Sequence, residues 1–197
     1  PIPPYIKNTP LSEFMLRKKY QTVFARNSGS IAAPTAALHF SDRVFESLSK
    51  AGIPHELLTL QVGLGTFAPV TEQQLQQKKL HQECYEIAAS TADRILRKRK
   101  QGKALVAVGT TTVRTLESFA TTTSRVGSTD LFIMPGFQFR MTDCLITNFH
   151  LPSSSLMMLV EAFLQHKKSR QSLLELYHIA IREKFRFYSF GDSMLVV

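Results

Sequence analysis

The 197-residue chain is poor in cysteine and has no tryptophan; its two cysteines are Cys84 and Cys144. Two cysteines this far apart provide neither a disulfide framework nor the paired spacing of a zinc site. We therefore expect a cytoplasmic protein in which each cysteine is a small buried hydrophobic residue. No apolar run approaches the ~20 residues of a membrane-spanning helix, and no signal peptide is visible, so no membrane partner is expected.

Several familiar catalytic signatures are also missing from the sequence. The P-loop lysine motif, the three-glycine dinucleotide turn and the Gly-x-Ser-x-Gly nucleophile elbow do not occur. His39, His81 and His150 are widely separated, and no histidine or cysteine pair has the spacing of metal ligands, so no metal is expected. These absences exclude the commonest nucleotide, hydrolase and metal sites.

What the chain has in excess is positive charge, a formal +9 at pH 7. Such a surplus favours a polyanionic partner, with nucleic acid ahead of an acidic membrane. Much of it lies in one run at the end of a predicted helix, where cations also complement the helix dipole without any partner. The candidate nucleic-acid contacts in this run are Arg94, Arg97, Lys98, Arg99 and Lys100.

Strand and helix patterns alternate along most of the chain, after an extended proline-rich arm over residues 1–10. The pattern predicts an α/β protein with a mixed, largely parallel sheet and helices on both faces. Strands are expected just before Pro34, at 57–62, 80–87, 104–108, 131–133, 137–141, 145–147 and at the C-terminus, with 104–108 central and 121–130 a loop. Helices are expected at 12–25, 41–52, from 71, at 90–102, after Gly109, from Ser153 or Ser154 and at 169–184.

Polar loops follow four of the predicted strands, at 34–39, 63–67, 109–114 and 148–154. If the strands are parallel, these loops meet at one edge of the sheet, where ligands of α/β proteins bind. They would form a pocket with histidines, hydroxyls, an arginine and aromatic walls. Taken singly, each loop is as typical of a capped helix or a bulge as of a ligand site.

The same loops carry a family resemblance that extends from end to end of the chain. The motifs are PPYI (3–6), YQTVFA (20–25), AAPTAALHF (32–40), VGLGTFAPV (62–70), AVGTTTVRTLES (107–118), FIMPGFQF (132–139), TNFHLPSSSLMMLV (147–160) and FRFYSFGDSM (185–194). In this order they resemble the S-adenosylmethionine:tRNA ribosyltransferase-isomerases of queuosine biosynthesis. Gln61 departs from the family pattern, which usually has histidine there.

The resemblance implies an enzyme that moves the ribosyl moiety of S-adenosylmethionine to 7-aminomethyl-7-deazaguanine at the tRNA wobble position. The products would be epoxyqueuosine in tRNA, adenine and methionine, so S-adenosylmethionine is a consumed substrate and no cofactor is expected. Family members carry a further N-terminal portion with a smaller β-barrel domain. We therefore expect residues 1–197 to be a monomeric α/β catalytic domain, incomplete at its N-terminus.

The implied reaction requires a base near the ribose, for which histidine or a carboxylate is the usual choice. The candidates are His150 and His39, followed by His81 and Glu83. Arg114 is expected to hold a substrate carboxylate or phosphate, unless it pairs with Glu117. The full set of expected substrate-binding residues is Thr35, Gly63, Gly65, Thr66, Phe67, Gly109, Thr110, Thr111, Arg114, Asn148, Phe149, Ser154 and Asp192.

Two other classes of function stay open at this point. The chain would be a truncated relative that binds tRNA without catalysis, or a small-molecule α/β enzyme whose Gly109 turn holds a sugar phosphate. Incubation with S-adenosylmethionine and precursor-bearing tRNA separates all three. Adenine release supports the transferase, tRNA binding without release supports the non-catalytic relative, and neither result supports the small-molecule enzyme.

Overall fold

The computed structural model describes residues 2–3, 5–7, 9–26, 29–63 and 70–197, and within them two three-stranded sheets. One sheet has the order β1-β2-β4 and is antiparallel throughout: β1 (Thr59–Gln61), β2 (Lys79–Glu86) and β4 (Val126–Leu131). The other has the order β3-β5-β6, with β3 parallel and β6 antiparallel to the middle strand: β3 (Val106–Val108), β5 (Cys144–Asn148) and β6 (Ser193–Val196).

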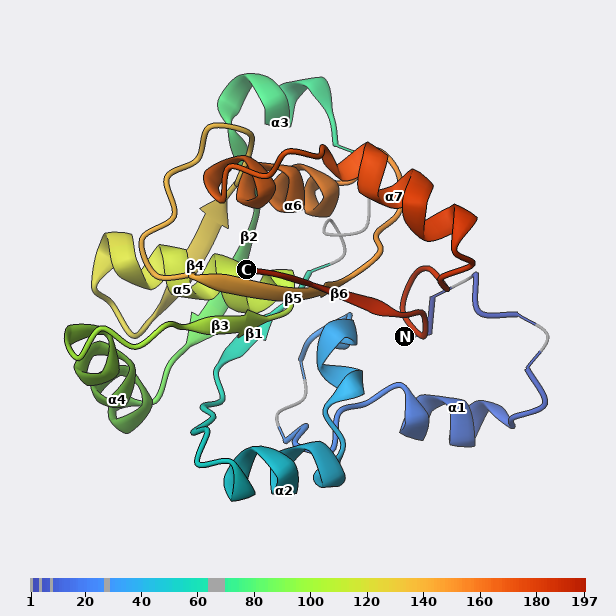
Figure 1. Ribbon diagram of the computed structural model, residues 1–197, viewed down its shortest axis with the longest axis horizontal. Helices are drawn as coiled ribbons and strands as arrows, with labels where there is room; N and C mark the ends of the chain where they lie inside the picture. The colour runs from blue at the N-terminus through green and yellow to red at the C-terminus, as the bar shows by residue number, and fades with distance from the viewer. Residues whose placement is uncertain (1, 4, 8, 27–28, 64–69) are drawn as a thin grey trace.

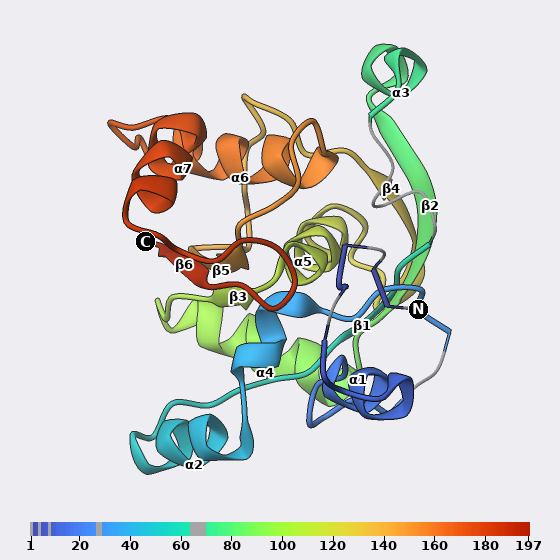
Figure 2. The same ribbon diagram turned by 90° about the vertical axis from the view of Figure 1, so that its right-hand side faces the viewer.

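Helices surround and separate the two sheets (Figures 1 and 2). They are α1 (Glu13–Lys19), α2 (Asp42–Lys50), α3 (Glu72–Gln77), α4 (Ala89–Lys100), α5 (Thr110–Thr122), α6 (Ser155–His166) and α7 (Leu173–Arg182), with a short 3₁₀ helix, η1 (Thr35–His39). Helix α5 lies between the sheets and contacts strands of both.

The position of α5 explains its unusual composition. Its apolar residues Val113 and Leu116 are buried, as in any core helix. Arg114 and Glu117 are also buried, because both sides of this helix are covered by protein. A buried charge must be paired or hydrogen-bonded. Arg114 and Glu117 therefore make polar contacts with the segments that pack on the two sides of α5.

The mixed α/β class and most local signals are confirmed. Thr71 and Gln74 form the predicted capping box of α3, and the Ser154 hydroxyl accepts from the Met157 amide at the start of α6. The predicted strand over 80–87 and the helix after Gly109 are both present. Gly109 has φ +90, a backbone angle that favours glycine.

The predicted strand arrangement is partly wrong. Only β3 and β5 pair in parallel among the strands that the structure describes, so the pairing is mostly antiparallel. Strand β3 lies at a sheet edge, with Val106 47% exposed, although its apolar run suggested a central position. A run of apolar residues predicts that a segment is covered by other parts of the protein. Helices can cover it as well as neighbouring strands, so the run does not require a central position in the sheet.

The boundaries around residues 120–141 also differ from expectation. The segment 121–130, predicted as a loop, contains the end of α5 and most of strand β4, which ends at Leu131, whereas 132–133 and 137–141 are not strands. Its hydroxyl residues suggested a loop, but Ser128 accepts a hydrogen bond from Gln82 of β2, and Thr129 bonds to Ser118. These contacts between neighbouring elements replace the apolar contacts that a strand pattern normally shows.

Two smaller expectations are wrong as well. Helix α1 ends at Lys19 rather than near Ala25, and Phe14 is 75% exposed. Cys84 is exposed on β2 and Cys144 is only partly buried, so neither is a fully buried hydrophobic residue. The alternation of a half-covered strand places Cys84 on the face opposite Glu83 and Tyr85.

Candidate functional site

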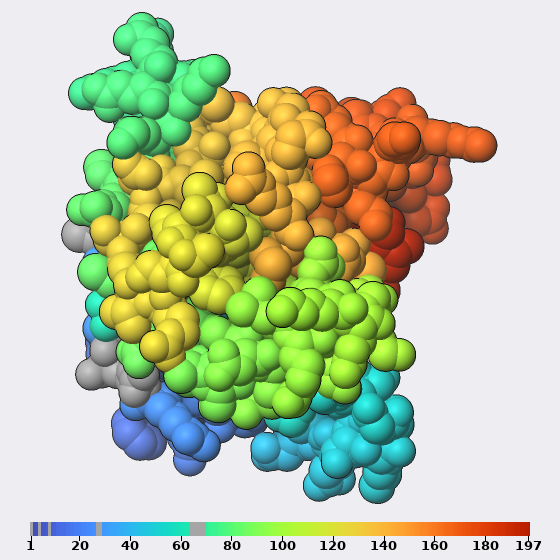
Figure 3. All heavy atoms as spheres, turned by 90° about the vertical axis from the view of Figure 1, so that its left-hand side faces the viewer, coloured from blue at the N-terminus to red at the C-terminus, as the bar shows by residue number. Residues whose placement is uncertain are grey.

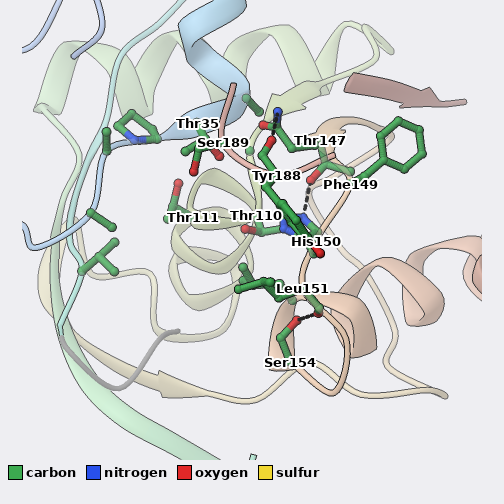
Figure 4. A pocket seen from close by; sticks show the side chains of 18 of the residues that line it. Thr35, Thr110, Thr111, Thr147, Phe149, His150, Leu151, Ser154, Tyr188 and Ser189 are labelled. Carbon is green, nitrogen blue, oxygen red and sulfur yellow. Dashed lines mark hydrogen bonds between the residues drawn. The ribbon is translucent and has the colours of Figure 1, made fainter. Parts of the chain in front are cut away.

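A small cavity lies where β3 and β5 end, at the same end of their sheet because the two strands are parallel (Figure 4). Its volume is about 60 Å³, enough for a few water molecules and far below the ~300–1,000 Å³ of a drug-sized ligand site. Its walls come from η1, the start of α5, the loop after β5 and the loop before β6. Eight of the expected site residues line it: Thr35, Gly109, Thr110, Thr111, Asn148, Phe149, His150 and Ser154.

His150 is the histidine that the structure places in this cavity. Its Nε2 lies 2.8 Å from the Thr147 hydroxyl, and its backbone N–H donates to the Tyr177 hydroxyl at 2.7 Å. Burial lowers the pKa of His150 to about 4, so its imidazole is neutral at pH 7. A general base works best with a pKa near the working pH, so this histidine is better suited to hydrogen bonding than to proton abstraction unless a ligand changes its surroundings.

Asn148 presents an acceptor that the protein itself leaves unused. Its Nδ2 donates to the carbonyl oxygens of Tyr188, at 3.2 Å, and Asp192, at 3.4 Å. Because both partners are acceptors, the amide orientation is determined by the contacts. The opposite atom, Oδ1, is buried and has no hydrogen-bond partner in the described part of the chain. A ligand N–H or O–H in the cavity would satisfy it.

Arg114 and Glu83 form a buried ion pair, and neither lines the cavity. The Arg114 Nε also donates to the Leu131 carbonyl at 3.2 Å, and the other Glu83 oxygen accepts from the Gly63 amide at 3.0 Å. The pair therefore connects α5 to β2, and its further hydrogen bonds extend the connection to the end of β4 and to Gly63, which follows β1. The structure places Glu83 as the counter-ion of Arg114, while the Arg114 Nη2 is buried and has no hydrogen-bond partner among the described residues.

The alternative pairing of Arg114 with Glu117 is wrong. Glu117 accepts hydrogen bonds from the amides of Arg140, Met141 and Thr142 and from the Thr142 hydroxyl, at 2.8 to 3.1 Å. A charge pair three residues apart on a helix contributes only ~0.2–0.5 kcal/mol, so a stronger partner that faces either side chain replaces it. Here each has one, because α5 is enclosed on both sides.

The other expected base residues lie away from the cavity lining. His39 and His81 are exposed, the first at the end of η1 and the second on β2. Asp192 accepts from the Arg186 amide and guanidinium, each at 2.7 Å, which holds its pKa below the ordinary value. It stabilises the turn before β6. Gly63 is held by Glu83, while Gly65, Thr66 and Phe67 lie outside the described residues.

Further aromatic and hydroxyl side chains, which were not among the expected site residues, complete the site. Ser189 bonds to the hydroxyls of Tyr5 and Tyr20, the latter at 2.9 Å, and burial raises the pKa of Tyr20 to about 12. Tyr5, Tyr188 and Ser189 line the cavity, so the N-terminal arm is docked there. The sequence feature that could have identified these residues is their position within the PPYI and FRFYSFGDSM motifs. Figure 4 shows the Phe149 ring pointing away from the cavity, and it packs on Tyr177 and Phe187.

The expected nucleic-acid contacts lie on α4. Arg94 is in an ion pair with Glu56 and Arg99 in one with Asp143, whereas Arg97, Lys98 and Lys100 are exposed. The structure also offers no group of three histidine, cysteine, aspartate or glutamate residues arranged for a metal ion in its described ranges. No helix among those ranges is both long and apolar enough to cross a membrane.

The fold and the cavity define an α/β protein with a hydroxyl-rich site at the edge of a mixed sheet. The family model described as queuosine biosynthesis protein matches residues 1–196, and the chain belongs to that family.

Relatives of known name match the whole chain. The chain is 46% identical over 201 residues to the S-adenosylmethionine:tRNA ribosyltransferase-isomerase of Thermotoga petrophila, covering 100% of this chain and 57% of the relative. With the Rubrobacter xylanophilus protein of the same name it is 48% identical over 197 residues, covering 100% and 55%. The chain thus spans little more than half the length of these relatives.

A solved structure is also similar, the S-adenosylmethionine tRNA ribosyltransferase of Thermotoga maritima. The two share 40% sequence identity and superpose with a TM-score of 0.67, over 83% of this chain and 51% of the other.

Proposed function

We propose that this chain is the α/β part of a tRNA-modifying ribosyltransferase-isomerase of queuosine biosynthesis. Its donor would be S-adenosylmethionine, consumed as a substrate, and its acceptor 7-aminomethyl-7-deazaguanine at the wobble position of tRNA. The products would be epoxyqueuosine in tRNA, adenine and methionine. We propose that it acts in the cytoplasm, as a monomer and without a further cofactor.

One observation carries this proposal. Motifs from six separate parts of the sequence contribute residues to a single cavity: PPYI, AAPTAALHF, VGLGTFAPV (through Val62), AVGTTTVRTLES, TNFHLPSSSLMMLV and FRFYSFGDSM. All six are among the motifs that carry the family resemblance, and relatives at 46–48% identity carry the corresponding name. A chance set of helix caps would not be expected to converge in this way.

The cavity holds only a small part of such a donor, so most of the ligand would extend beyond its mouth. The free amides at the start of α5, with the hydroxyls of Thr110 and Thr111, suit a carboxylate. The unused acceptor of Asn148 suits a hydroxyl or an amine. Neutral His150, bonded to Thr147, would orient a ribose hydroxyl and, once a ligand raises its pKa, accept a proton.

The test is incubation of the protein with S-adenosylmethionine and tRNA that carries the precursor base. We expect adenine release that depends on that tRNA, together with a new nucleoside after digestion of the tRNA. Binding of tRNA without adenine release would replace this proposal with that of a non-catalytic relative. Absence of both would refute any role in this reaction for the chain by itself.

A further inference from the structure

Asp143 joins three basic segments that are far apart in the sequence. Its carboxylate pairs with Arg99 at the end of α4, and its backbone carbonyl accepts from Lys167 Nζ at 3.0 Å, just after α6. Arg99 also donates to the Arg140 carbonyl at 3.0 Å. The end of α4, the loop before β5 and the end of α6 therefore lie side by side.

These segments form what we call the basic surface, defined by six exposed cations: Lys98, Lys100, Lys103, Arg140, Lys168 and Arg170. Figure 3 shows the green atoms of α4 and the orange atoms of the α6 end on the same face of the molecule. The carboxylate of Asp143 is already engaged by Arg99 and by the Leu105 amide, at 2.7 Å. It therefore organises the surface while leaving these six cations available.

The basic surface lies at the end of the β3-β5-β6 sheet opposite to the cavity, where β3 and β5 begin. Leu105 and Asp143 precede β3 and β5, whereas Gly109 and the loop from Asn148 follow them. The four residue steps from Leu105 to Gly109 span roughly 13 Å at ~3.3 Å per step. Since one turn of a nucleic-acid duplex covers ~34 Å, a single structured RNA is long enough to contact both places.

The two places differ in the chemistry they offer. Tyr188 and Phe190, 36% and 42% exposed, belong to the loop on the cavity side, and exposed aromatic rings of this kind are what unstacked bases pack against. The three segments of the basic surface, all within the described residues, expose no phenylalanine, tyrosine or tryptophan. Their exposed imidazole, that of His166, packs against the rings of Phe139 and Phe163. Cations without stacking partners contact phosphates and carry no base specificity.

We propose that the basic surface binds the phosphate backbone of a double-stranded stem of the tRNA. This rests on the proposed function for the identity of the RNA, and it extends the interface from α4 to Arg140 and the end of α6. The cavity side would receive the unpaired base while the basic surface holds the stem.

The test compares two triple variants that remove the same charge. The first, Lys98→Ala with Arg140→Ala and Lys168→Ala, takes one cation from each segment. The matched control, Arg43→Ala with Lys50→Ala and Lys78→Ala, removes three exposed cations from α2 and the end of α3. Binding of an unmodified tRNA transcript is measured by fluorescence anisotropy over a range of salt concentrations, without S-adenosylmethionine.

We expect the first variant to bind about tenfold more weakly or worse, and the slope of log K against log salt to fall by roughly 2, since each lost phosphate contact removes ~0.7–0.9. The control should retain most of the affinity. Equal losses in both variants would point to the overall charge and overturn the proposal, as would no loss in either. Circular dichroism checks that both variants are folded.

Two further probes identify the partner. A duplex RNA should reproduce the difference between the variants, and a single strand of the same length should reduce it; the reverse result overturns the assignment to a stem. Tighter binding to vesicles of anionic phospholipid than to tRNA would make this a membrane surface instead. Because adenine release is not measured, the basic surface stands or falls independently of catalysis.

Discussion

The Nε2 of His150 lies 2.8 Å from the hydroxyl oxygen of Thr147, a residue of β5 with no exposed surface. This contact joins the loop to the strand from which it emerges, and it holds the imidazole in the cavity (Figure 4). The position of His150 is therefore set by the sheet rather than by a flexible loop.

Replacing His150 tests its role in chemistry. In a complete protein that releases adenine, we expect His150→Ala to lower turnover by roughly 10²–10⁴-fold, the usual range for a group that moves a proton. Stability should fall by about 1–3 kcal/mol, because the buried Thr147 hydroxyl loses its hydrogen-bond partner. Steady-state kinetics and thermal unfolding measure the two effects. Proportionate losses of activity and stability would instead assign His150 to packing.

The low pKa of His150 makes stability depend on pH. Its folded pKa, about 4, is below the ordinary 6.5, so the unfolded chain binds more protons between these values. The contribution of the neutral imidazole is complete above pH 6.5 and is lost as pH falls toward 4. At pH 5 we expect a loss of about 2 kcal/mol. Urea unfolding at pH 7 and pH 5 should show this loss in the wild type and not in His150→Gln.

The buried pair of Glu83 and Arg114 should be far more sensitive than an exposed pair. Glu83→Gln or Arg114→Leu leaves a charge or a polar group buried, which costs about 3–5 kcal/mol when a buried ion pair is broken. Glu13 and Arg17, an exposed pair on α1, provide the control, and Glu13→Gln should cost at most about 0.5 kcal/mol. Denaturant unfolding compares them. Similar small costs at both sites would show that the buried charges are replaceable.

Gly191 is expected to be essential for the loop between α7 and β6. A Cβ at this position would collide with the backbone carbonyls of Arg186 and Phe187. Gly191→Ala should therefore displace this loop, with the loss of the Tyr188 and Asp192 carbonyls that hold Asn148.

The control for this prediction is Gly52→Ala. Gly52 has φ +66, and a Cβ added there would meet no atom of the described residues within 4 Å, its chain neighbours aside. The cost of Gly52→Ala should therefore be about 1 kcal/mol, from backbone strain alone. We expect Gly191→Ala to lower the thermal midpoint more than Gly52→Ala does. A smaller effect at Gly191 would mean that the loop adjusts without loss.

Local signals in the sequence were sufficient for much of this protein. The capping box of Thr71 and Gln74, the Ser154 cap and the turn at Gly109 depend on residues within four positions of one another, so their geometry follows from short-range hydrogen bonds and allowed backbone angles. The motifs likewise identified the family, and most of the loops that carry them meet at the cavity.

Other features were decided only by the tertiary structure. Arg114 selects Glu83, distant in sequence, over Glu117, three residues away, because α5 is enclosed between two sheets and presents a different neighbour on each side. The hydroxyl-rich segment 121–130 forms the end of α5 and β4 because β2 and α5 supply partners for its hydroxyls. The low pKa of His150 has the same origin, since burial depends on what the whole chain packs around a residue and not on its neighbours in sequence.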